Sequence, residues 1–415
     1  MTIRIMPDSV RRVAKLELVR DRTVAPSATM WPALAVLPLL VAGRFKAVGL
    51  SDVAGIDLTL LAAAFLCAVA GWLGFRGRGI SIGGTAVLWF FLSVVALSHL
   101  ESAASDYANE KSVLLFFLTV PVILAVLVLI RSIKDLRGLL LTWVAAGTLI
   151  ALASLLLGER SYRFTLGGNY LDTSYIVGTA LAVLVFAASD RWIPLWVTIP
   201  LMVVNSVVML ALGARGPLLA LAAAVVWRVV TARSGLRAVF GVIASLALAT
   251  TLGWMFAGQG AKTRYSLIFE AGVREDLRNA AVQTWLSQPF AGVGWGSFGS
   301  SSGSGSFYPH NIFAEAAAEM GVVGLSAVIL LIMAALVRSW RYRFDSTCAA
   351  AGGIAVFWLV QAQFSGDLSS RFVWLALVPC LVLQELFRRG PMPTVAGAIS
   401  RRTDLGGRRQ VKEFN

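Results

Sequence analysis

Apolar blocks of roughly 20 residues recur along almost the whole chain, and each is long enough to cross a ~30 Å hydrocarbon layer as a helix. Because a bilayer core offers no hydrogen-bond partners to an open backbone, such blocks must be helical. Only 14% of the residues are charged and 58% are hydrophobic, whereas soluble domains carry about 25% charged residues. The sequence therefore predicts an all-α polytopic membrane protein.

The apolar blocks predict about twelve transmembrane helices. They are expected at residues 29–43, 53–75, 80–100, 112–130, 137–157, 173–189, 192–212, 216–232, 236–257, 310–337, 347–364 and 371–387. Most of the 36 lysines and arginines lie in both terminal segments and in alternate connections, which the positive-inside bias assigns to the cytoplasm. The predicted organisation is a basic cytoplasmic segment (1–28), transmembrane helices one to nine (29–257), one large periplasmic loop (258–309), transmembrane helices ten to twelve (310–387) and a basic cytoplasmic tail (388–415).

The net charge of +14 would suggest a nucleic-acid partner in a soluble protein. In a membrane protein it is better explained by topology and by contact with anionic membrane lipids, so no nucleic acid is expected. The three cysteines, Cys67, Cys348 and Cys380, all lie in apolar blocks, which argues against a disulfide framework.

Several basic residues fall on the predicted periplasmic side, against the bias. Arg44, Lys46 and Lys111 are interpreted as facing water. Arg215 differs, because it sits in ALGARGPLL, a connection of a few residues between two apolar blocks. It therefore has little room to leave the membrane interface.

The one long connection has two halves of different character. Its charged first half, KTRYSLIFEAGVREDLRNAAVQTWL, is expected to be partly helical. Its second half, SQPFAGVGWGSFGSSSGSGSF, is rich in Gly and Ser and is interpreted as a mobile loop. The glycines of GVGWGSFG resemble a dinucleotide-binding loop in spacing only, since no strand precedes them.

His310 is one of only two histidines, and it stands where a predicted transmembrane helix begins. Pro309 suits a helix start, which places His310 in the first helical turn. The positive end of the helix dipole and nearby arginines both disfavour an imidazolium. His310 is therefore expected to be neutral near pH 7 and able to act as a general base, although anchoring the helix at the headgroup level is an alternative role.

Helical spacing predicts one face formed by His310, Ala314, Ala317, Gly321 and Gly324. The four residues after the histidine on this stripe have small side chains, which permit close helix packing. Glu315 lies on a neighbouring stripe, with Asn311. Because a carboxylate facing lipid is costly, Glu315 is expected to face protein or a wet cavity. It could pair with an external arginine, orient the histidine, or be protonated and structural.

Arginines at the outer face call for an anionic substrate. A forked guanidinium matches phosphate oxygens bidentately and can stabilise a leaving pyrophosphate without Mg²⁺. The sequence contains no carboxylate pair at metal-ligand spacing, so no metal is expected. This chemistry suggests a lipid-linked phosphate or pyrophosphate substrate.

These motifs resemble those of a known family. His310-Asn311, nine residues and then Gly321-Val322-Val323-Gly324 resembles the H-N-x9-G-x-x-G signature of bacterial O-antigen ligases, within the O-antigen ligase/polymerase family. ALGARGPLLALAAA is similar to the family's Arg-Gly turn, and LRNAAVQTWLSQPFAGVGWGSF to its Arg-containing helix with a following Gly-rich loop. RFTLGGNYLDTSYIVGTALAV resembles the Asn-containing entry to a span. The predicted layout, with one large periplasmic loop before the histidine, is also similar.

The resemblance implies an inverting, GT-C-type membrane glycosyltransferase of lipopolysaccharide biosynthesis. It would move a polysaccharide from undecaprenyl pyrophosphate to a sugar hydroxyl of the lipid A core, at the periplasmic face of the bacterial inner membrane. His310 would be the catalytic base, supported by Asn311 and Glu315, with no cofactor. The implied pyrophosphate-binding residues are Arg215, Arg278, Arg163 and Arg264.

Other functions stay open. A polymerase or a protein O-oligosaccharyltransferase of the same family would share the donor and differ in the acceptor. A transporter or flippase would be a different class, but transporters place ionisable groups near the bilayer midplane, often in repeated halves. Here the polar cluster lies at one face.

Overall fold

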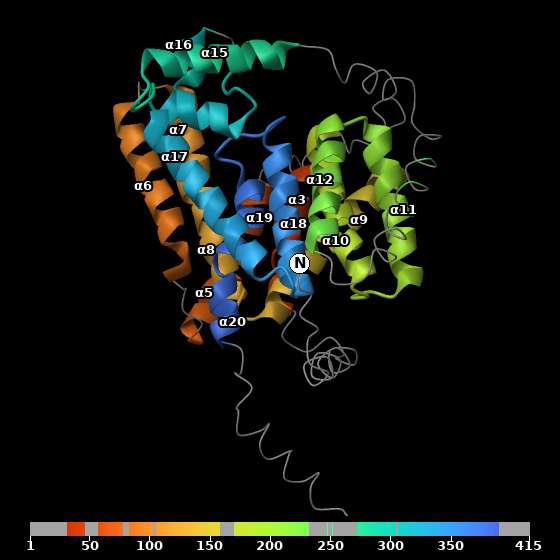
Figure 1. Cartoon of the computed structure of the whole chain (residues 1–415). Helices are drawn as coiled ribbons and strands as arrows, with labels where there is room; N and C mark the ends of the chain where they lie inside the picture. The colour runs from red at the N-terminus through yellow and green to blue at the C-terminus, as the bar shows by residue number, and fades with distance from the viewer. Residues whose placement is uncertain are drawn as a thin grey trace, which may run out of the picture.

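The computed structural model describes residues 31–45, 57–77, 83–102, 105–157, 170–231, 272–303 and 306–389, with the isolated positions 247 and 251. Within these residues the fold is helical, without strands. Most helices stand side by side, whereas α15 and α16 lie across one end of the bundle (Figure 1). The predicted all-α fold is confirmed for these residues.

The helices follow the predicted apolar blocks closely. In chain order they are α2 (Trp31–Leu34), α3 (Leu37–Phe45), α5 (Leu58–Phe75), η3 (Gly83–Thr85), α6 (Ala86–Glu101), α7 (Asp106–Val113), η4 (Leu114–Thr119), α8 (Val120–Leu129), α9 (Ile133–Leu157), α10 (Tyr170–Ser189), α11 (Leu195–Leu212), α12 (Arg215–Thr231), α15 (Val273–Ser287), α16 (Phe298–Ser302), α17 (Ile312–Arg341), α18 (Ser346–Gln361), α19 (Arg371–Leu381) and α20 (Leu383–Arg389). The predicted span at 236–257 lies outside the described residues, apart from positions 247 and 251.

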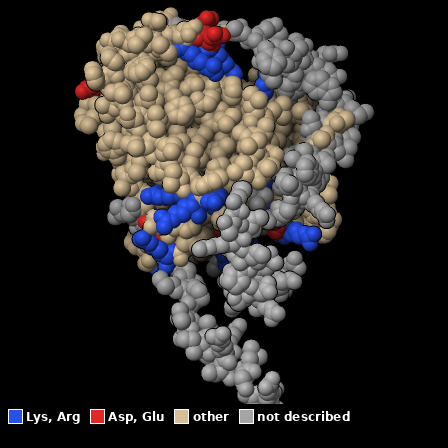
Figure 2. Space-filling view, in the orientation of Figure 1, with Lys and Arg blue, Asp and Glu red and all other residues tan. Residues whose placement is uncertain are grey.

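Six described helical segments are long and apolar enough to cross a membrane. They are Leu58–Phe75, Asp106–Leu129, Ile133–Leu157, Tyr170–Ser189, Leu195–Leu212 and Ile312–Arg341, with shorter apolar helices at Ala86–Glu101 and Ser346–Gln361. The face seen in Figure 2 has a broad belt without charged residues, and basic residues lie above and below it. The chain is therefore a multi-pass membrane protein. The number of about twelve spans stays a prediction.

Short polar signals decide where individual helices begin. Asp57 caps α5, because its carboxylate accepts from the backbone N–H of Thr59 at 2.7 Å, so the helix starts later than the predicted residue 53. Asp345 caps α18 in the same way through the N–H groups of Thr347 and Cys348. The first predicted span is broken into α2 and α3 just before Pro38, which has no N–H to continue a helix.

Helix α10 occupies the centre of the bundle and packs against α9, α11, α12 and α18. Small residues permit this close packing. A β-carbon at Gly178 of α10 would lie 2.9 Å from the ring of Phe357 in α18. This contact holds α18 closely against α10, which matters because Ala362, just after α18, bonds to Ile312 at the start of α17.

Helix α17 is kinked at Gly321, whose φ of 60° and ψ of −158° are not helical. The kink redirects the backbone groups around it. The N–H of Val322 donates to the carbonyl of Pro289 at 2.8 Å, while the carbonyls of Ala318 and Glu319 become free for partners outside the helix.

The Gly-rich segment before α16 supplies those partners, so its interpretation as a mobile loop was wrong. The N–H groups of Val293 and Gly294 donate to the carbonyls of Ala318 and Glu319, each at 2.9 Å. Trp295 and Phe298 are fully buried. The glycines here permit close backbone approach and positive φ, rather than flexibility.

We predict that Gly321→Ala destabilises the protein by about 1–3 kcal/mol or more, because its backbone conformation is open essentially to glycine alone. A β-carbon would also collide with the carbonyl of Phe290. The measurement is the thermal unfolding midpoint of purified protein in detergent. Gly71→Ala in α5 is the matched control, since no atom lies within 4 Å of its β-carbon position. Equal midpoints for the two variants would show that the kink is not required.

Candidate active site

His310 lies in the segment before α17 and not in its first turn, contrary to the prediction. Asn311 is the N-cap instead, because its side-chain oxygen accepts from the N–H groups of Phe313 and Ala314 at 3.0 Å each. His310 precedes this cap with a left-handed φ of 55°. The predicted stripe from His310 through Gly321 therefore does not form, since the first member is not helical and the kink interrupts the rest.

The imidazole of His310 is half-buried against the ring of Tyr308, with ring centroids 4.5 Å apart and an edge-on arrangement. Its Nδ1 atom is buried and has no hydrogen-bond partner within the described part of the chain. Burial lowers the pKa of His310 below its ordinary value of 6.5, and the Arg274 guanidinium lowers it further, against an opposing effect of Asp367. The imidazole is therefore neutral at pH 7, as expected, although burial is the main cause.

The end of α18 forms a junction, residues 361–363, that touches the other parts of the site. The carbonyl of Ala362 accepts from the N–H of Ile312 at 3.3 Å. The side-chain oxygen of Gln363 accepts from the Asn311 amide at 2.9 Å, and the backbone carbonyl of Gln363 accepts from Nη2 of Arg278 at 3.1 Å. This 361–363 junction joins α15 and the start of α17 to α18.

The Arg-Gly turn lies against the same junction. Helix α11 ends at Gly213, which has a left-handed φ of 70°, and α12 begins at Arg215. Gly216 packs on the side chain of Gln361, because a β-carbon there would lie only 2.8 Å from the Gln361 side-chain oxygen. The glycine after Arg215 thus permits this close approach without a shift of the Gln361 side chain.

Arg278 itself, and the residues next to Arg215 and His310, therefore contact one junction at one end of the bundle. We call this end the His310 end. Arg163 and Arg264 lie outside the described residues, so their placement stays a prediction.

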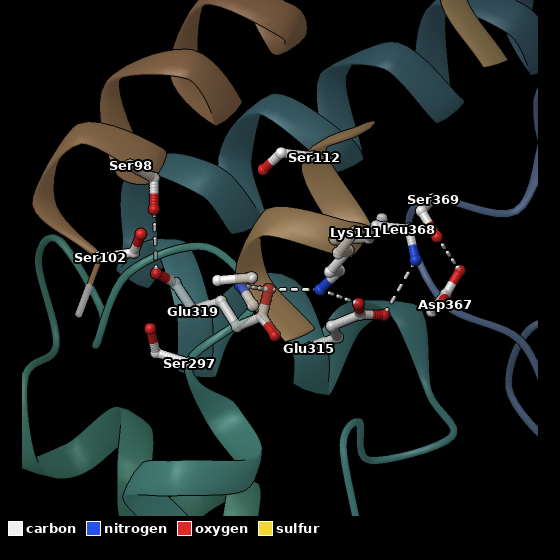
Figure 3. A network of polar contacts seen from close by, with 12 residues as sticks. Ser98, Ser102, Lys111, Ser112, Ser297, Glu315, Glu319, Asp367, Leu368 and Ser369 are labelled. Carbon is white, nitrogen blue, oxygen red and sulfur yellow. Dashed lines mark hydrogen bonds and ion pairs between the residues drawn. The ribbon is translucent and has the colours of Figure 1, made fainter. Parts of the chain in front are cut away.

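Helix α17 also carries the two glutamates of a buried ion cluster (Figure 3). The Nζ atom of Lys111 is 2.5 Å from Oε1 of Glu315 and 2.5 Å from Oε2 of Glu319. It also lies 4.1 Å from the ring centre of Trp295. Lys111 is 1% exposed, so the interpretation that it faces water was wrong. The partner of Glu315 is this lysine and not an external arginine.

Both glutamates also hold backbone segments. Oε2 of Glu319 accepts from the N–H of Gly296 at 2.9 Å, and Oε2 of Glu315 accepts from the N–H of Leu368 at 3.0 Å. The latter bond fixes the connection between α18 and α19, which includes Asp367. Glu315 thus supports the site indirectly, by positioning this connection.

Residues 200–329 match the family model described as O-Antigen ligase. This stretch is an O-antigen ligase domain. A comparison with curated proteins finds no significant match. The ligase domain contains Arg215, Arg278, His310 and the kinked helix segment, whereas Lys111 and the 361–363 junction lie outside it. The domain therefore depends on contacts from both flanking parts of the chain.

Several residues of the candidate site were not predicted from the sequence. Arg274 was not among the predicted site residues, although it precedes Arg278 by one helical turn and so shares its face of α15. Gln361 and Gln363 have no sequence motif that indicates a binding site, because they stand at the end of an apolar helix. Within the described residues there is no group of three or more His, Cys, Asp or Glu side chains that could hold a metal ion.

We predict that Lys111→Met costs about 3–5 kcal/mol of stability, because it leaves two buried carboxylates without their cation. Thermal unfolding in detergent measures the effect. Lys134→Met is the control, since Lys134 is exposed on α9 and its loss should change stability by less than about 0.5 kcal/mol. If the Lys111 variant unfolds at the same temperature as the Lys134 variant, the ion cluster does not hold the His310 end together.

Proposed function

We propose that the protein is an O-antigen ligase that transfers a polysaccharide from undecaprenyl pyrophosphate to a sugar hydroxyl of the lipid A core. The observation that carries the proposal is the meeting of three segments, which carry Arg215, Arg278 and a neutral His310, at one junction at the end of a membrane bundle. The O-antigen ligase domain at 200–329 supports the same donor chemistry.

The proposed reaction is a single displacement. His310 takes the proton of the acceptor hydroxyl, and the hydroxyl oxygen forms a bond to the anomeric carbon of the donor sugar. The bond from that carbon to the pyrophosphate oxygen breaks, and its electron pair leaves with the lipid pyrophosphate. Because attack and departure occur on opposite faces, the anomeric configuration inverts.

In the proposed reaction, arginine side chains rather than a metal ion stabilise the negative charge of the leaving pyrophosphate. Arg215 and Arg278 bind the pyrophosphate, and their fixed charges stabilise it as its negative charge develops. Arg274 adds a further positive charge beside His310. Arg163 and Arg264 are proposed to complete the cluster, and the enzyme needs neither a metal nor a nucleotide.

The proposed architecture is of the GT-C type, with about twelve transmembrane helices in the bacterial inner membrane. The basic terminal segments, 1–28 and 388–415, lie in the cytoplasm by the positive-inside bias. The His310 end then faces the periplasm, where residues 258–309 lie between the ninth and tenth helices. The six apolar helices and the concentration of the site at one end support this arrangement.

We predict that His310→Ala lowers transfer by at least about 100-fold, the scale of a lost general base. Arg215→Ala and Arg278→Ala should each lose roughly 100- to 1,000-fold, because charge stabilisation of the leaving group is removed. The assay combines purified protein, lipid-linked glycan and core-lipid acceptor, and EDTA should have no effect.

Arg341→Ala is the control for that assay, since Arg341 is exposed at the opposite end of α17 and should retain full transfer. Full activity of the His310 variant would exclude its role as base. Glycan extension in the absence of core acceptor would identify a polymerase instead.

We also predict an acidic limb in the pH–rate profile. Because burial lowers the pKa of His310 below 6.5, the base stays neutral down to that pH and transfer should fall only at lower pH. The measurement is kcat/KM between pH 5 and 8. The residual rate of His310→Ala should lack this limb, and a limb centred well above pH 6.5 would contradict the assignment.

A further inference from the structure

Gln361 carries a buried amide that the fold leaves without partners. The side chain is 1% exposed. Neither its Nε2 nor its Oε1 atom has a hydrogen-bond partner within the described residues. A buried amide in this state is unfavourable, and a leucine of similar volume would avoid the cost.

A neighbouring glutamine shows that the same helix end can satisfy an amide when its role is structural. Nε2 of Gln363 donates to the carbonyl of Leu359 at 3.0 Å, and its Oε1 accepts from Asn311 at 2.9 Å. Both glutamines belong to the 361–363 junction, yet only Gln361 is unpartnered. A structural role therefore does not explain why position 361 carries an amide.

The position of the Gln361 amide points to the donor. Its oxygen and nitrogen would lie 2.8 Å and 3.3 Å from a β-carbon at Gly216, so the amide adjoins the turn that begins with Arg215. The next residue, Ala362, accepts through its carbonyl from the N–H of Ile312, two residues after His310. The amide thus adjoins the turn that carries the proposed pyrophosphate-binding arginine, and it belongs to a junction that also contacts the segment of the proposed base.

We propose that Gln361 binds the donor where its pyrophosphate meets the first sugar, an inference that rests on the proposed function. Nε2 donates to a phosphoryl oxygen and Oε1 accepts from a hydroxyl of the sugar. An amide suits this place because a glycosyl pyrophosphate presents acceptors on one side of the glycosidic bond and hydroxyl donors on the other.

The same geometry strengthens the binding. Because the amide is already removed from water in the fold, donor binding adds hydrogen bonds without a further desolvation cost to this side chain. The rotamer is also held by packing on Gly216, so little conformational freedom is lost on binding.

Binding of two probes to purified protein in detergent tests the inference. They are undecaprenyl pyrophosphate and the same lipid carrying a glycan. Gln361→Leu should raise the Kd for undecaprenyl pyrophosphate by roughly 10- to 100-fold, as for loss of a hydrogen bond to a charged group. The rise should be larger for the glycan-bearing lipid, because two hydrogen bonds are lost. Gln361→Glu should weaken both probes further by repelling the phosphates.

Thermal unfolding without ligand separates binding from folding. Gln361→Leu should unfold at the wild-type temperature or above it, since no satisfied hydrogen bond is removed. Asn205→Leu in α11 is the matched control, because that buried amide donates to Thr148 at 3.1 Å and to Leu201 at 2.8 Å. The control should unfold at a lower temperature but keep the wild-type Kd for both probes.

The inference is overturned if both Gln361 variants bind the probes within about threefold of wild type, or if Gln361→Leu destabilises the protein as much as Asn205→Leu. Equal losses for the two probes would overturn the contact with the sugar. These binding results stand independently of turnover. A wild-type protein that binds the donor but transfers no glycan would overturn the proposed function alone.

Discussion

The His310 end of the protein depends on one buried cation. Lys111 is held by Glu315 and Glu319, which lie one turn apart on α17, and a buried charge is tolerated only when it is paired in this way. The same two carboxylates also accept from the backbone of the Gly-rich segment and of the connection after α18. One lysine on a short polar helix therefore fixes the relative position of three segments around the site.

The second constraint is the backbone of α17 at Gly321. The kink leaves carbonyl groups that a straight helix would use itself, and the Gly-rich segment donates to them. Its glycines adopt positive φ at positions 292, 294 and 296, where their neighbours come too close for a side chain. A composition typical of a flexible linker thus produces an ordered segment, because the N–H groups of residues 293 to 296 donate to α17 or α6.

The sequence predicts the helices well, because each apolar block is a property of its own residues. Its short motifs also single out Arg215, Arg278 and His310, whose segments meet at one junction in the fold, while their roles stay predictions. It fails where the partner is remote, since Lys111 and Glu319 are 208 positions apart and α7 by itself is polar. The start of α17 was misplaced for a local reason. Pro309 suggested one helix start, but the Asn311 side chain satisfies two first-turn amides and therefore sets the boundary.

Two kinds of polar group meet at the His310 end. Asn311, Gln363 and Glu319 are each bonded to at least two partners, and these bonds hold segments together. The imidazole Nδ1 of His310 and the amide of Gln361 are buried without partners within the described residues. Unsatisfied buried groups reduce stability, so selection for stability alone would remove them. Both belong to segments that meet at the 361–363 junction, as Arg215 and Arg278 do, and a site that binds a polar donor needs hydrogen-bonding atoms left open for the substrate.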